Sequence, residues 1–143
     1  MNRGYIKINI EEGKTPTVEA KLVDNNVWMS KWDMLRLFDC FGQKIEMNLR
    51  SIFKNRLLNE DEVTYTYRYT DKGVEKQREY FNLEVLIFLS YRIGTYQAQI
   101  FRQFVNSALR EHLQRKETEK CTKLIWQFRR NQNYWLNRNS DLF

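Results

Sequence analysis

The chain has 143 residues, enough for one domain with an appendage, and its 42% hydrophobic and 15% aromatic content excludes wholesale disorder. A net charge of +6 makes polyanions more plausible partners than cationic surfaces. The N-terminus lacks the apolar core of a signal peptide, and the longest apolar run, Val85 to Leu89, is too short to span a bilayer. We therefore expect a cytoplasmic protein with no membrane contact.

The first thirty residues predict a small antiparallel sheet. Tyr5 to Ile10 and Thr17 to Val23 alternate between apolar and polar side chains, as half-buried strands do. Turn residues fill Glu11 to Lys14 and Asp24 to Asn26. Val27 to Met29 is then a brief apolar strand that leads into the next element.

Residues 30–56 predict two short helices joined by a tight turn. Ser30 and Asp33 have the spacing of a capping box at the start of the first helix, which we expect to end near Phe38. We expect Phe41 and Gly42 to break this helix, and Gly42 is the one residue here that could take a left-handed backbone at no steric cost.

The second helix of this pair is amphipathic, with one apolar and one net-basic face. The apolar face carries Ile45, Leu49, Ile52 and Phe53. The outer face carries polar and basic side chains together with one thioether: Lys44, Met47, Asn48, Arg50, Ser51 and Lys54. The pattern is that of a helix-turn-helix, whose second helix lies in the DNA major groove. On spacing alone, an ordinary helical hairpin with a solvated charged face is the commoner structure.

A β-hairpin is predicted directly after the helices. Its arms are Val63 to Tyr69 and Val74 to Phe81, with a glycine in the connecting turn. Three tyrosines, Tyr65, Tyr67 and Tyr69, share one face of the first arm. The hairpin also carries four cations that would contact the DNA backbone if it were a wing: Arg68, Lys72, Lys76 and Arg78. The alternative is a hairpin that packs on the sheet and leaves these charges in solvent.

The rest of the chain is predicted to be helical. Asn82 is a good N-cap for a helix that is apolar nearly all round, and a long amphipathic helix follows as far as Leu113. Beyond it, helical apolar spacing indicates a contact with a partner subunit, most simply in a homodimer, through Leu124, Ile125, Phe128 and Trp135. The basic, aromatic segment 129–135 is also suited to binding single-stranded nucleic acid by stacking.

With these segments laid out, the chain resembles the RhuM family of bacterial virulence-associated and mobile-element proteins. The matching pieces cover about residues 4–113 in the family's order and spacing: Asn26 to Ser30, Met34 to Phe38, Ile52 to Lys54, Leu58 to Glu60, Tyr80 to Glu84, Tyr91 to Ile93, and Phe101 with Arg102. The family resembles the N-terminal DNA-binding domains of phage antirepressors. The resemblance therefore implies DNA binding and favours the helix-turn-helix over the ordinary hairpin.

These observations predict an α+β fold: a winged-helix-like helix-turn-helix with a small antiparallel sheet and a β-hairpin wing, followed by long C-terminal helices. Residues 1–113 would form this domain and residues 114–143 a helical extension. The expected function is double-stranded DNA binding by a regulator or antirepressor-like factor of a mobile element or genomic island. The alternative is a protein-interaction module built on the same scaffold.

Catalysis is not expected. The chain has no P-loop, GxGxxG, HExxH or GxSxG motif. Cys40 and Cys121 lack CxxC spacing, and His112 is the single histidine. We therefore expect no metal, no cofactor and no small-molecule substrate.

Overall fold

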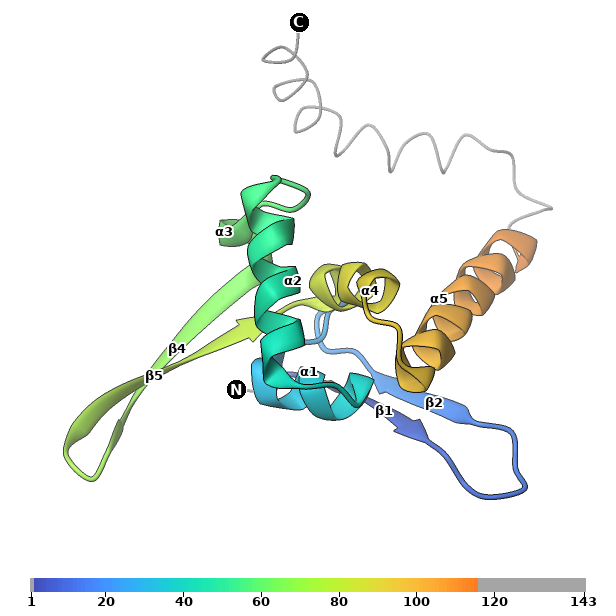
Figure 1. Ribbon diagram of the computed structural model, residues 1–143, viewed down its shortest axis with the longest axis horizontal. Helices are drawn as coiled ribbons and strands as arrows, with labels where there is room; N and C mark the ends of the chain where they lie inside the picture. Colours follow the sequence, from blue (N-terminus) through green and yellow to red (C-terminus); the bar gives the residue numbers. More distant parts are fainter. Residues whose placement is uncertain (1, 116–143) are drawn as a thin grey trace, which may run out of the picture. The chain divides into compact units, whose positions relative to one another are not determined.

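The computed structural model describes residues 2–115 (Figure 1). The chain divides into two units, residues 1–106 and residues 107–143. The described part is α+β, with small antiparallel sheets and several helices, which confirms the coarse fold class expected from the sequence. Among residues 2–115, no helix is long and apolar enough to cross a membrane. The predicted partner contacts at Leu124, Ile125, Phe128 and Trp135 lie outside the described residues.

Two separate sheets replace the single N-terminal sheet. Strands β1 (Tyr5–Asn9) and β2 (Thr17–Lys21) form one antiparallel hairpin. Strand β3 (Met29–Ser30) belongs instead to a second sheet of order β3-β5-β4, with β4 spanning Thr64–Asp71 and β5 spanning Val74–Phe81. Figure 1 shows the two hairpins extending away from the helices in different directions.

The pairing of β3 with β5 follows from burial. Met29 lies opposite Phe81 in the register, and both side chains are buried in the core. The cross-strand pair therefore removes two large apolar groups from water. The prediction of one sheet in front of the helices was wrong for this reason.

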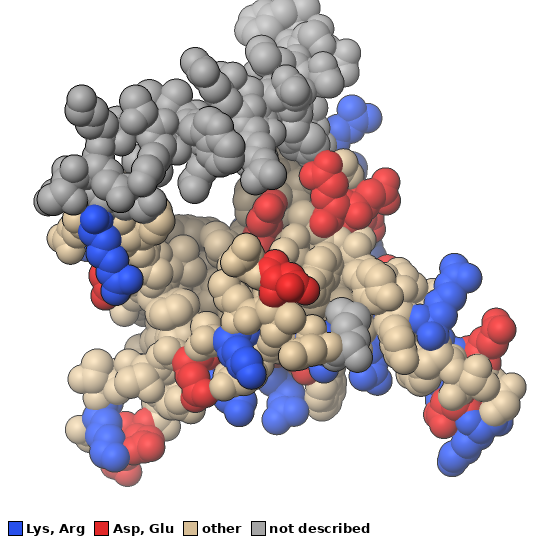
Figure 2. Space-filling view, turned by 180° about the vertical axis from the view of Figure 1, so that it is seen from behind, with Lys and Arg blue, Asp and Glu red and all other residues tan. Residues whose placement is uncertain are grey.

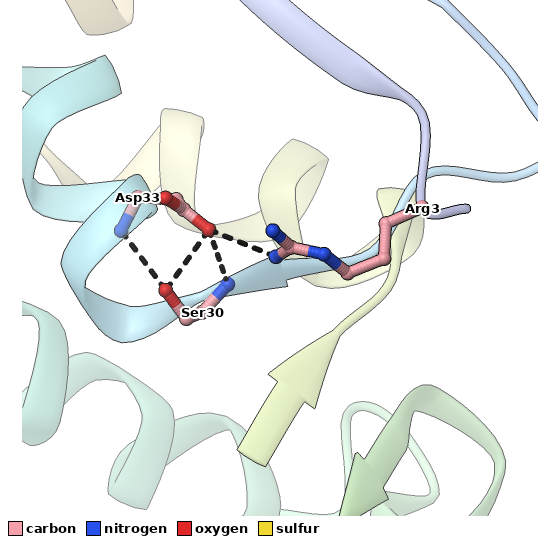
Figure 3. A network of polar contacts seen from close by, with 3 residues as sticks. All are labelled: Arg3, Ser30 and Asp33. Carbon is pink, nitrogen blue, oxygen red and sulfur yellow. Dashed lines mark hydrogen bonds and ion pairs between the residues drawn. The ribbon is translucent and has the colours of Figure 1, made fainter. Parts of the chain in front are cut away.

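Helix α1 (Lys31–Phe38) begins at the predicted capping box. The Ser30 hydroxyl accepts a hydrogen bond from the Asp33 amide at 3.2 Å, and the Asp33 carboxylate accepts one from the Ser30 amide at 3.0 Å. Arg3 donates to the same carboxylate at 3.2 Å (Figure 3). The network ties the N-terminal segment to the start of α1.

The turn between α1 and helix α2 (Gly42–Lys54) does not depend on its glycine. Asp39 holds the left-handed conformation, with φ 49° and ψ 58°, and its amide donates to the Leu35 carbonyl. Gly42 is simply the first residue of α2, so the predicted role of Gly42 was wrong. The short polar side chain of aspartate tolerates this region better than most side chains do.

The remaining helices close the core around α2. A single helical turn, α3 (Glu60–Val63), follows α2. Asn82 caps helix α4 (Leu83–Arg92) by accepting from two backbone amides, as expected. Helix α5 (Tyr96–Arg115) contributes Phe101, whose ring meets that of Phe38 edge-on at 5.7 Å. The shared core includes the buried residues Val27, Met34, Phe38, Ile45, Leu49, Ile52, Val85, Leu86, Leu89 and Phe101.

Candidate nucleic-acid interface

Helix α2 presents an open outer face. Ile45, Leu49 and Ile52 are buried on its inner side, as the amphipathic pattern predicts. At 100° per residue the opposite direction falls near Met47 and Lys54, flanked by Gln43 and Arg50. Met47 is 60% exposed, and Gln43, Lys44, Arg50 and Lys54 are also exposed. A straight helical surface of this kind has the dimensions of a major-groove element.

The positive charges on this face are not neutralised by neighbouring acids. Within residues 2–115, no ion pair links Lys44, Arg50 or Lys54 to a carboxylate. The one acid of α2, Glu46, lies on the flank and pairs with Lys31 of α1 at 2.6 Å. The outer face therefore keeps a local excess of positive charge that an approaching polyanion would meet.

Arg92, at the end of α4, joins this surface and was missed by the sequence analysis. Its Nε donates to Asn48 Oδ1 at 3.1 Å, and its terminal nitrogen donates to Ser51 Oγ at 2.7 Å. The Asn48 amide also donates to the Lys44 carbonyl at 2.9 Å. Asn48 and Ser51 are thus held against α4 rather than pointing freely outward.

The signal for Arg92 was indirect. A basic residue in the last turn of a helix is common, because it stabilises the negative end of the helix dipole. Arg92 has that position in α4, and nothing in its spacing indicates that the guanidinium reaches another helix forty-four residues away in sequence. This contact depends on how α2 and α4 pack.

The predicted wing residues do not lie on one surface. Arg78 is paired with Tyr67 across the hairpin and Lys76 with Tyr69, so these two cations share the tyrosine face. Arg68 is paired with Gln77 on the other face, together with Glu75 and Glu79. Lys72 lies at the tip, in a two-residue turn with Gly73 in which both φ angles are positive.

The face of the hairpin that lies toward α2 is not the tyrosine face. Phe81, on the Arg68 face, stacks on Phe53 of α2 with ring centroids 6.5 Å apart. On the opposite face, the Tyr65 ring meets Trp28 edge-on at 6.4 Å, and the Arg3 guanidinium lies 4.6 Å from the centre of the Tyr80 ring. The two sides of the sheet therefore face different parts of the molecule.

Charge on the back of the molecule is mixed. Figure 2 shows basic and acidic side chains interspersed on the face opposite to that of Figure 1, including along the β4–β5 hairpin. Lys76 is bound to Asp71 at 2.6 Å, and the hairpin also carries two further acids, Glu75 and Glu79. The hairpin therefore adds less free positive charge than its four cations suggest.

Cys40, in the turn before α2, has no features of a nucleophile. Burial raises the pKa of its thiol, and the charge of Asp39 raises it further against the opposing effect of Lys44. The thiol therefore stays protonated at neutral pH. Among residues 2–115, no group of three or more His, Cys, Asp or Glu side chains is arranged to hold a metal ion.

Comparisons with protein-family models, with curated proteins and with solved structures found no significant match to this chain.

Proposed function

We propose that this protein is a winged-helix DNA-binding protein of the RhuM type, acting in the cytoplasm as a regulator or antirepressor-like factor of a mobile element. In this proposal α1 and α2 are the helix-turn-helix, and α2 enters the major groove. The β4–β5 hairpin is the wing. Residues 114–143 join two copies into a homodimer.

The observation that carries the proposal is the unneutralised, solvent-open outer face of α2. Lys44, Arg50 and Lys54 have no acidic partner in the described part of the chain, and Glu46 is held aside by Lys31. Phosphate oxygens on both sides of a major groove are the natural partners of such cations. Arg92 lies beside them and supplies a fourth positive charge.

The experiment is a binding titration of duplex DNA of random sequence near 0.1 M salt. We expect the wild-type chain to bind and Lys44→Glu/Arg50→Glu/Lys54→Glu to lose at least tenfold in affinity, because three attractive contacts become repulsive. A matched control reverses three exposed lysines on the β1–β2 hairpin, Lys7, Lys14 and Lys21, which changes the net charge equally. Equal losses in both variants would show that net charge, not α2, attracts DNA.

The second candidate function is a protein-interaction module. A groove of about 400 Å³ between the start of α1 and strand β5 is lined by Arg3, Lys31, Trp32, Arg78 and Glu79 among others. Trp32 is 64% exposed there, so a large apolar ring lies open to solvent beside the groove. If this groove binds a protein partner, Trp32→Ala should lower the affinity for that partner and leave the affinity for DNA unchanged. This outcome separates the two functions.

A further inference from the structure

The polar side chains best suited to reading bases are held by a residue from another helix. Asparagine pairs with adenine by using the oxygen and nitrogen of its amide together. In Asn48 the oxygen accepts from Arg92 Nε at 3.1 Å and the nitrogen donates to the Lys44 carbonyl at 2.9 Å. Arg92 can only donate and a carbonyl can only accept, so this orientation of the amide is the one that satisfies both partners.

Ser51 is held in the same way. Its hydroxyl oxygen accepts from Arg92 at 2.7 Å and from the Asn55 amide at 3.3 Å. Both bonds to the Arg92 guanidinium are charge-assisted, so Arg92 competes with a base edge for the Asn48 and Ser51 oxygens. On the flank of α2 beside α4, the Asn48 and Ser51 side chains are therefore occupied by hydrogen bonds within the protein.

What remains at the centre of the outer face is a thioether. Met47 is two residues after the buried Ile45 and two before the buried Leu49, so its side chain leaves the helix nearly opposite the core. It is 60% exposed, with Lys44, Arg50 and Lys54 around it. An apolar group on a helix face that also carries cations fits duplex DNA, whose major groove offers one apolar feature, the C5 methyl group of thymine.

We infer that α2 recognises thymine methyl groups through Met47, while Arg92 keeps Asn48 and Ser51 out of base recognition. The inference rests on the proposed function, because it names what α2 contacts within the groove. Lys44, Arg50 and Lys54 supply the affinity, and Met47 supplies the base preference. Methionine is suited to this contact because its flexible, polarisable side chain adapts to an irregular apolar surface.

The test begins with duplexes selected by the full-length protein from random sequence at physiological salt. Each thymine of the selected site is then replaced singly by deoxyuridine, which removes the methyl group and nothing else. We expect at least one replacement to weaken wild-type binding about fourfold, the loss that corresponds to one buried apolar carbon. In Met47→Ala the same replacement should have little effect, because the contact is already gone.

Asn48→Ala is the matched control, since it removes the neighbouring side chain of α2 that Arg92 holds against α4. We expect this variant to keep the base preference of the wild type at every position. Duplex binding that ignores uracil at all positions, uracil sensitivity that survives in Met47→Ala, or a preference lost in Asn48→Ala would each overturn the inference while leaving DNA binding intact. Failure to select any duplex would overturn the proposed function and the inference with it.

Discussion

Asp39 carries the left-handed backbone of the turn between α1 and α2. This conformation costs a residue with a Cβ about 1–2 kcal/mol, and aspartate less than a β-branched residue. We therefore expect Asp39→Val to lower the free energy of unfolding by about 1 kcal/mol and Asp39→Gly to leave it nearly unchanged, measured by urea denaturation. Equal losses in the two variants would contradict a backbone role for Asp39.

Gly42, the first residue of α2, provides the complementary test. A Cβ added there would meet its nearest heavy atom, Leu35 Cδ2, at an ordinary van der Waals distance of 3.9 Å. Since Gly42 is the first residue of α2 and its φ is not positive, Gly42→Ala should stabilise the protein by up to about 1 kcal/mol. A loss of stability in thermal denaturation would mean that the glycine is required after all.

Ser30 is the other residue on which the start of α1 depends. It is buried, and its hydroxyl accepts from the Asp33 amide. Ser30→Ala should cost about 1 kcal/mol in the free energy of unfolding, the usual loss for an N-cap. Ser107→Ala, at an exposed position within α5, is the control and should change stability by less than about 0.5 kcal/mol. Indistinguishable unfolding curves for the two variants would refute the capping role.

At the scale of elements, Arg102 joins α5 to the end of α4. Its guanidinium donates to the Ile93 carbonyl at 3.0 Å and also to the Ser90 carbonyl, which lie at the C-terminus of α4. We expect Arg102→Ala to lower the free energy of unfolding by about 1–3 kcal/mol, because loss of this partly buried charged donor removes its hydrogen bonds to the Ser90 and Ile93 carbonyls. Arg110→Ala, exposed on the same helix, should fall within about 0.5 kcal/mol of the wild type by urea denaturation. Similar losses in both would contradict the α4 contact.

Local elements were largely predictable because local signals specify them. The capping box, the buried face of α2, the hairpin arms and the Asn82 cap all depend on residues a few positions apart. The role of Gly42 could not be predicted in this way. Residue type shows which position tolerates a left-handed backbone, but it does not show that Asp39 is the residue that adopts it. The membership of β3 in the second sheet depends on a pairing across fifty residues, which periodicity does not report.

The candidate site was predictable in part for the same reason. Helical spacing correctly placed Lys44, Met47, Arg50 and Lys54 on the open side of α2. The separation of Arg68 from Lys76 and Arg78 was available from the sequence, since odd and even positions of one strand alternate in face once the turn fixes the register. The contact of Arg92 with Asn48 and Ser51 was not available, because it requires the packing of α4 on α2.

For the molecule as a whole, the proposed homodimer makes a prediction about mass. Light scattering on the full-length chain should give twice the monomer mass of 17.6 kDa. Leu124→Asp/Phe128→Asp should give the monomer mass, since charges at an apolar interface are costly. A wild-type monomer at all concentrations would contradict the proposed homodimer. The proposed binding of DNA by α2 would not be affected by this result.

The proposed contact between the outer face of α2 and DNA phosphates should make binding depend strongly on salt concentration. Each phosphate contact contributes about one to the slope of log affinity against log salt concentration. Lys44→Ala/Arg50→Ala/Lys54→Ala should therefore lower the slope of the wild type by about three, while Lys7→Ala/Lys14→Ala/Lys21→Ala should leave it unchanged. A wild-type affinity that does not vary with salt, or a slope that the α2 variant retains in full, would show that α2 does not contact DNA phosphates.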